Sequence, residues 1–136
     1  MTLKIDHVAI VVKDIEAALS VYRDALQLPL ERVEEVSAEQ VKVAFLPPPD
    51  GGAEIELIQP TSADSGVAKF LEKRGEGIHH ICVTVEDIEA SMANLAAKGL
   101  QVLEEKPRVG SRGQKYVFVH PKSTHGVLLE LYEEPK

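Results

Sequence analysis

The sequence lacks several features that would assign it to other classes of protein. It has one cysteine, Cys82, so no disulfide can form within the chain, which suits a reducing cytoplasm. No secretory signal opens it, and no apolar run approaches the length that spans a membrane. The formal net charge is −7, whereas nucleic acids and anionic membranes attract basic surfaces. We therefore expect a soluble, cytoplasmic protein that binds neither nucleic acid nor a membrane, while an anionic small ligand is still allowed.

What the sequence does contain is an internal repeat. Residues 6–12 read Asp-His-Val-Ala-Ile-Val-Val and are followed by Asp-Ile-Glu-Ala at 14–17. Residues 79–85 read His-His-Ile-Cys-Val-Thr-Val and are followed by Asp-Ile-Glu-Ala at 87–90. The offset is the same from His7 to His80 as from Asp14 to Asp87. A repeat of half the chain indicates one supersecondary unit used twice.

Both copies predict the element order βαβββ. The pattern of apolar residues, caps and turn residues predicts these elements in the first copy: strands at 3–12, 30–37, 41–46 and 53–59, and a helix from 14 to about 27 that Pro29 stops. The second copy predicts strands at 78–85, near 100–104, at 115–119 and at 127–131, and a helix at 88–98. A linker at 61–77 holds a short helix at 66–74. We expect one α+β domain, 1–136, of two tandem βαβββ modules, 3–60 and 78–136, that form a curved mixed sheet.

Strand alternation selects four candidate metal ligands. In the first strand of each copy, His7 or His80 shares a face with small or mildly polar residues, opposite a face of large β-branched ones. In the last strand of each copy, Glu56 or Glu130 points away from a face of large aliphatic residues. A lone histidine or glutamate in a strand is more often structural, but four at matched positions of a repeat favour a site. Two imidazoles and two carboxylates suit a divalent cation, whose charge the carboxylates balance.

Around these residues the sequence resembles the vicinal oxygen chelate superfamily, whose glyoxalase-like fold arranges βαβββ modules around a metal site. Within it, the chain is most similar to the methylmalonyl-CoA epimerase family. The matching runs are residues 6–10, 67–71, 79–82, His-Pro-Lys-Ser at 120–123 and Gly-Val-Leu-Leu-Glu-Leu at 126–131. The resemblance covers essentially the whole chain. It implies an isomerase of propionate metabolism that binds a CoA thioester and forms a homodimer.

The resemblance also implies a reaction. The enzyme would interconvert the 2R and 2S epimers of methylmalonyl-CoA by removing and returning the α-proton through a metal-stabilised enolate. One divalent ion per chain is implied, with Co²⁺ favoured and Mn²⁺, Ni²⁺ or Zn²⁺ possible. Glu130 would be ligand and base, and Glu56 the fourth ligand or the second base. Some relatives place glutamine at the position of Glu56 and an acid on the third strand, whereas this chain has Val-Lys-Val-Ala at 41–44.

Four further residues are candidates for contacts with the substrate. Arg112, in the glycine-rich loop at 110–113, could bind a substrate carboxylate or the CoA phosphates. His120, Lys122 and Ser123 lie in the His-Pro-Lys-Ser loop and could contact the CoA portion.

Two other residues have structural interpretations. Strand alternation sends His79 away from the predicted metal, and Cys82 is expected to be an inert buried thiol.

Two alternative functions share this pattern. A lactoylglutathione lyase of the glyoxalase I type would use the same four ligands on a glutathione adduct, and the carboxylate at 56 permits it. A non-catalytic, ligand-binding member of the superfamily is disfavoured by the complete set of histidines and glutamates. A ring-cleaving dioxygenase ranks below both, because it ordinarily has a 2-His-1-carboxylate iron site and a longer chain.

Overall fold

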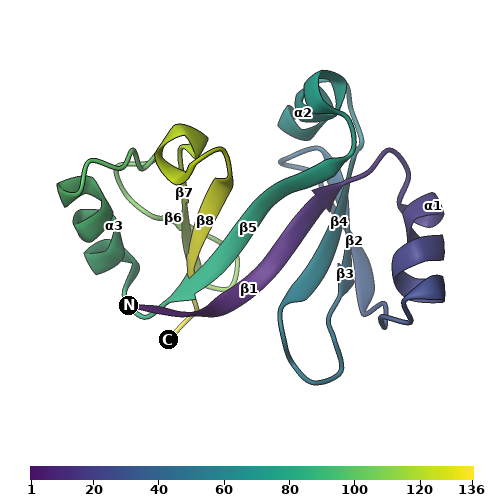
Figure 1. Ribbon diagram of the computed structural model, residues 1–136, viewed down its shortest axis with the longest axis horizontal. Helices are drawn as coiled ribbons and strands as arrows, with labels where there is room; N and C mark the ends of the chain where they lie inside the picture. Colours follow the sequence, from purple (N-terminus) through teal and green to yellow (C-terminus); the bar gives the residue numbers. More distant parts are fainter. The chain divides into compact units, whose positions relative to one another are not determined.

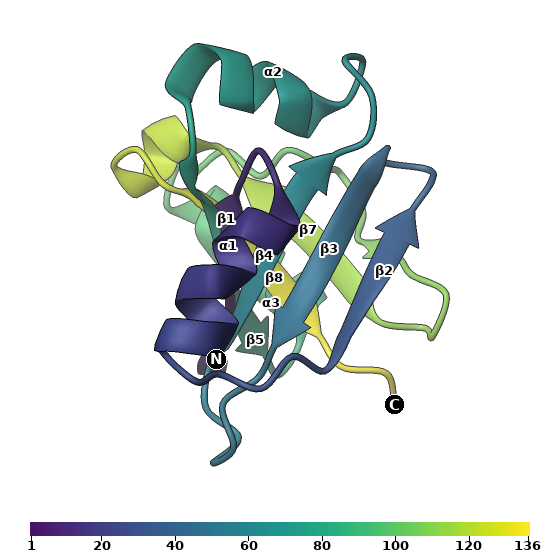
Figure 2. The same cartoon turned by 90° about the vertical axis from the view of Figure 1, so that its right-hand side faces the viewer.

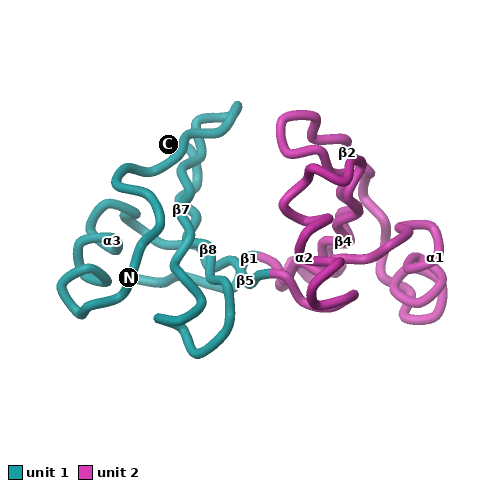
Figure 3. The backbone as a smooth tube through the Cα atoms, turned by 90° about the horizontal axis from the view of Figure 1, so that it is seen from above, with its two compact units in different colours: residues 1–6, 80–136 teal, residues 7–79 magenta.

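The computed structural model describes residues 1–136 and consists of two compact units. Residues 7–79 form the N-terminal unit, and residues 1–6 with 80–136 form the C-terminal unit (Figure 3). Strand β1 (Thr2–Val11) contributes its first residues to the C-terminal unit and the rest to the N-terminal unit. No helix is long and apolar enough to cross a membrane. The organisation of the whole chain as one domain stays a prediction.

The N-terminal unit is the first βαβββ module followed by the linker helix (Figure 1). After β1 come α1 (Ile15–Leu19), a π-helical segment (Ser20–Ala25), β2 (Arg32–Val36), β3 (Val41–Leu46), β4 (Glu54–Pro60) and α2 (Gly66–Arg74). The strand order is β2-β3-β4-β1. β1 is parallel to β4, and the other neighbours are antiparallel, so the sheet is mixed as predicted. Figure 2 shows β2 and β3 side by side in this sheet.

The C-terminal unit repeats this topology. Its elements are β5 (Gly77–Val85), apart from residues 77–79, which belong to the N-terminal unit, α3 (Ile88–Ala97), β6 (Arg108–Val109), β7 (Lys115–Val119), a 3₁₀ turn (Pro121–Thr124) and β8 (Leu128–Glu133). The order β5-β8-β7-β6 matches β1-β4-β3-β2, with β5 parallel to β8 and the remaining pairs antiparallel. The prediction of two tandem βαβββ modules with mixed sheets is therefore confirmed.

The prediction of a strand near 100–104, the second strand of the C-terminal module, is wrong. That stretch makes only an isolated bridge, between Val102 and Val119, and the strand that occupies this place in the module is β6. The N–H of Leu103 still donates to the carbonyl of Phe118 at 2.8 Å, but the N–H of Phe118 donates to the Glu104 carboxylate at 2.9 Å. A side chain thus takes the place of a main-chain acceptor, and the ladder ends there.

The end of the first helix also differs from the prediction. The α-helical part stops at Leu19, and the next residues widen into π-helix in which the N–H of Leu26 donates to the carbonyl of Val21. Gln27 then adopts a left-handed conformation, φ 63°, which reverses the chain after the helix. Pro29 follows the stop and does not cause it.

Alternation in the strands places the core of each module under its helix. In the N-terminal unit, Leu19 of α1 packs with Leu46 and Leu57, which are fully buried. In the C-terminal unit, Ile88 of α3 packs with Val117 and Leu131 on the corresponding face. The opposite faces are therefore left for His7 with Glu56 and for His80 with Glu130.

The repeat extends to the start of each helix. The carboxylates of Asp14 and Asp87 accept the N–H groups of Glu16 and Ala90 and so cap the N-termini of α1 and α3. A second acceptor comes from the last strand of each module. The Gln59 side chain accepts the N–H of Ile15, and the buried Glu133 accepts that of Ile88, both at 2.9 Å. These contacts tie β4 to α1 and β8 to α3, and thereby fix the last strand that carries each glutamate.

Candidate active site

The N-terminal unit holds a buried pair formed by His7 and Glu56. The two residues lie on the parallel neighbours β1 and β4, where Ala9 is the residue in register with Glu56. Nδ1 of His7 is 3.2 Å from Oε2 of Glu56, and the side chains are only 10% and 15% exposed. Phe45 of β3 is in register with Glu56 on its other side, so an aromatic ring borders the carboxylate.

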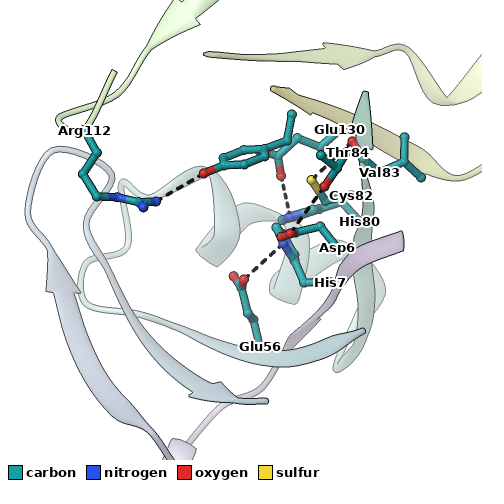
Figure 4. Close-up of polar contacts among 10 residues, drawn as sticks. Asp6, His7, Glu56, His80, Cys82, Val83, Thr84, Arg112 and Glu130 are labelled. Carbon is teal, nitrogen blue, oxygen red and sulfur yellow. Dashed lines mark hydrogen bonds and ion pairs between the residues drawn. The ribbon is translucent and has the colours of Figure 1, made fainter. Parts of the chain in front are cut away.

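The C-terminal unit holds the equivalent pair, His80 and Glu130 (Figure 4). Nε2 of His80 is 3.2 Å from Oε1 of Glu130, with side-chain exposures of 10% and 12%. β5 and β8 are again parallel, and Phe118 of β7 is in register with Glu130. The Phe118 ring meets the His80 imidazole edge-on, with 5.9 Å between the ring centroids. The sequence could have revealed these rings, because Phe45 and Phe118 are separated by the same offset as the histidines.

Both pairs have the chemistry of metal-ligating groups. An imidazole beside a carboxylate supplies one nitrogen and one oxygen donor, the types that divalent transition metals accept. Burial of a carboxylate is costly unless a positive charge or hydrogen bonds compensate it, and a metal ion provides that charge. The buried histidines and glutamates are therefore compatible with a divalent metal site.

Comparison with known proteins places this arrangement in a family. Residues 6–118 match the model of the Glyoxalase/Bleomycin resistance protein/Dioxygenase superfamily. The chain belongs to this superfamily. It is 40% identical over 130 residues to the ethylmalonyl-CoA/methylmalonyl-CoA epimerase of Cereibacter sphaeroides, covering 94% of this chain and 96% of the relative. A lactoylglutathione lyase of Haemophilus influenzae is 30% identical over 133 residues, covering 96% and 93% of the two chains.

Solved structures of superfamily members agree with the fold. Methylmalonyl-CoA epimerase from Mycobacterium tuberculosis has a TM-score of 0.87 at 36% identity, covering 99% of this chain and 89% of that one. A variant of the Streptomyces coelicolor methylmalonyl-CoA epimerase in complex with 2-nitronate-propionyl-CoA has a TM-score of 0.86 at 37% identity, covering all of both chains. The glyoxalase-like fold implied by the sequence is therefore confirmed.

Of the candidate substrate contacts in this superfamily member, Arg112 lies on the same side of the C-terminal sheet as Glu130. Its guanidinium donates to the hydroxyl of Tyr132, with 3.3 Å between nitrogen and oxygen (Figure 4). Tyr132 is two residues beyond Glu130 on β8 and therefore shares its face. Strand alternation alone puts Tyr132 on this face, but it assigns no role to the residue.

The His-Pro-Lys-Ser loop is held by its own polar side chains. Nδ1 of His120 accepts the N–H of Lys122 at 3.0 Å, and Oγ of Ser123 accepts the N–H of Gln101 at 2.9 Å. His120 and Ser123 thus order the loop, whereas the Lys122 side chain is exposed. A role for these residues in binding the substrate stays a prediction.

The two residues expected to be structural have surroundings that fit. The imidazole of His79 packs edge-on against Phe70 of α2, with 4.9 Å between the ring centroids. Cys82 has no exposed surface, which is the environment of an inert thiol.

Proposed function

We propose that this protein is a methylmalonyl-CoA epimerase in which His7, Glu56, His80 and Glu130 bind one divalent metal ion per chain. The observation that carries the proposal is the pair of equivalent, buried His–Glu contacts, one in each module. The similarity to epimerases over nearly the whole chain supports the choice of substrate.

The substrate explains why such a site needs both a cation and carboxylates. The α-carbon of a methylmalonyl thioester lies between a carboxylate and a thioester carbonyl, so removal of its proton gives an enolate. A bound divalent ion, Co²⁺ by family resemblance or else Mn²⁺, Ni²⁺ or Zn²⁺, supplies the positive charge that stabilises this enolate. The chain's own residues hold that ion and transfer the proton.

Glu130 is the proposed base. Its carboxylate is held by His80 on one side and bordered by Phe118 on the other, so it is fixed in direction and largely shielded from water. It accepts the α-proton, and an acid on the other side of the carbon returns one. Glu56 is the candidate for that second role or for the fourth ligand. Val43, which shares the face of Glu56, is buried and apolar and offers no alternative on β3.

The remaining parts of the proposal rest on the family. The CoA thioester would be contacted by Arg112, His120, Lys122 and Ser123, and the enzyme would act in the cytoplasm as a homodimer.

A lactoylglutathione lyase activity is the second candidate. It is favoured by the carboxylate at Glu56, which completes a set of four protein ligands, and by the relative of that name. The same base and cation would serve a proton transfer within the glutathione adduct.

Proton exchange in deuterated water tests both candidates. Metal-loaded protein is incubated in D₂O with methylmalonyl-CoA, and the loss of the α-proton signal is followed by NMR. We expect rapid exchange by the wild type and none by Glu130→Gln, which keeps the side-chain volume but removes the base. The glutathione–methylglyoxal adduct is tested in parallel. Turnover of the adduct without exchange on the thioester would replace the first candidate by the second.

A further inference from the structure

We infer that Arg112, positioned by Tyr132, binds the free carboxylate of the acyl group and so selects dicarboxylic thioesters. This inference rests on the proposed function and adds a determinant of specificity to it. It follows from the absence of a carboxylate partner at Arg112 and from the place of Tyr132 on β8.

Arg112 has no carboxylate partner, unlike Arg32 and Arg108. Arg32 pairs with Glu31 and Glu34, and Arg108 pairs with Glu104. The side chain of Arg112 instead meets the neutral hydroxyl of Tyr132. A guanidinium has five N–H donors, and a single phenolic oxygen leaves most of them for another acceptor. Its positive charge is therefore available to an anion.

The loop presents Arg112 in a defined place. The N–H of Arg112 donates to the side-chain carbonyl of Gln114 at 2.9 Å, and the N–H of Gly110 donates to the main-chain carbonyl of Gln114 at 2.8 Å. A Cβ atom at Gly110 would overlap the end of the Gln114 side chain, so a larger residue there would displace the side chain that accepts the N–H of Arg112. The turn thus fixes the main chain of Arg112, while Tyr132 contacts its guanidinium.

The position of Tyr132 indicates which anion is bound. Residues two apart on a strand are separated by about 7 Å. Tyr132 is that far along β8 from Glu130, the proposed base, and Arg112 contacts the hydroxyl at the tip of its ring, on the same face of the strand. The oxygens of the acyl carboxylate are two bonds from the carbon that loses its proton. The phosphates of CoA lie at the far end of the pantetheine arm, so the acyl carboxylate is the anion within reach.

The charges in the site explain why a guanidinium is needed to bind the substrate carboxylate. Two glutamates neutralise the charge of a dication. The metal ion and its ligands together therefore have no net positive charge to attract the substrate carboxylate. Removal of the α-proton then adds a second negative charge. A guanidinium that forms paired, charge-assisted hydrogen bonds to a carboxylate offsets the first of these charges.

A thermodynamic cycle between protein and ligand tests the inference. Isobutyryl-CoA has the shape of methylmalonyl-CoA with a methyl group in place of the carboxylate. Dissociation constants of both are measured by calorimetry on metal-loaded protein, and the preference is their ratio. We expect Arg112→Gln to reduce the preference for methylmalonyl-CoA by about tenfold to a hundredfold, the range for hydrogen bonds to charged groups. The affinity for isobutyryl-CoA should change less than about threefold.

Matched variants distinguish the effect of the positive charge from that of the contact with Tyr132 and from a loss of folding. Arg108→Gln removes the same charge from the same hairpin and should leave the preference within about twofold of the wild type. Tyr132→Phe keeps the ring but removes the acceptor, so it should lower the preference several-fold while Arg112 remains. Arg112→Lys should restore part of it, because lysine keeps the charge but not the two-pronged geometry.

Each alternative outcome has a distinct meaning. Equal weakening of both ligands by Arg112→Gln would show that Arg112 contacts CoA or orders the loop, and would overturn the inference. An unchanged preference would overturn it as well. In both cases, exchange of the α-proton by the wild type would leave the proposed function standing. A wild type that neither exchanges the proton nor binds methylmalonyl-CoA would overturn the proposed function and this inference together.

Discussion

Replacement of Glu130 by glutamine should weaken metal binding while the protein remains folded. The amide keeps the volume of the side chain, which is 12% exposed and 3.2 Å from His80, but it removes a negative oxygen donor. Even groups that only orient a metal ligand contribute 10- to 100-fold to metal affinity, so loss of a ligand should weaken binding by at least about 100-fold. We expect one Co²⁺ per chain to bind the wild type and much weaker binding by the variant.

The effect on stability follows from mass action. At a metal concentration 100 times the dissociation constant, a bound ion stabilises the native state by about 2.7 kcal/mol. Unfolding entropy of about 2.1 cal/mol/K per residue gives about 0.29 kcal/mol/K for this chain, so the wild-type Tm should rise by about 9 °C. At the same concentration, a variant with 100-fold weaker binding gains only about 0.4 kcal/mol, or about 1.4 °C.

Calorimetric metal titration and thermal unfolding, with and without a chelator, measure both quantities. Glu133→Gln is the matched control, because Glu133 lies on the same strand but the opposite face and the amide can still accept the N–H of Ile88. It should retain the full metal-induced rise in Tm. Wild-type metal affinity in Glu130→Gln would refute the assignment of Glu130 as a ligand.

Two further predictions concern the matched residues of the repeat. Gln59→Ala and Glu133→Ala should each lower the free energy of unfolding by about 1–3 kcal/mol in urea titrations, because each leaves the first N–H of a helix without its acceptor. Variants as stable as the wild type would contradict the capping role. Glu56→Gln should reduce metal affinity if Glu56 is a ligand, or abolish α-proton exchange with metal affinity retained if it is only a base; a variant normal in both respects would remove Glu56 from the site.

The sequence predicted the residue pairs because two simple periodicities coincide in them. Alternation along β1 and β4 assigns His7 and Glu56 to the face away from α1, and the repeat assigns His80 and Glu130 to the same positions. Each pair is formed by neighbouring parallel strands, so the local βαβββ order is sufficient to bring its two members together. No knowledge of distant packing was needed for either contact.

The features that escaped prediction depend on side chains that replace main-chain partners or reach across a loop. Glu104 caps the N–H of Phe118 and ends a ladder that the apolar pattern at 100–104 favoured. The contact between Arg112 and Tyr132 depends on the turn that Gln114 closes; alternation along β8 gives the face of Tyr132 but not its partner. Local propensity describes strands and helices well, but it does not describe which polar side chain completes a turn.

The symmetry of the repeat matches the symmetry of the proposed reaction. Epimerisation returns a proton to the side of the carbon opposite the one from which it left, so a proton-transfer group is needed on each side. A duplicated module supplies two carboxylates in similar surroundings, each beside an imidazole and a phenylalanine ring. A reaction that removes and returns a proton from one direction would need only one of them. On β3, the residues that share the face of Glu56 are Val41, Val43 and Phe45, none of which can transfer a proton. Glu54 shares the face of Glu56 on β4, but Glu56 is the carboxylate whose oxygen lies 3.2 Å from the imidazole of His7. The second proton-transfer step of the proposed epimerase is therefore assigned to Glu56, unless it is held as a ligand throughout.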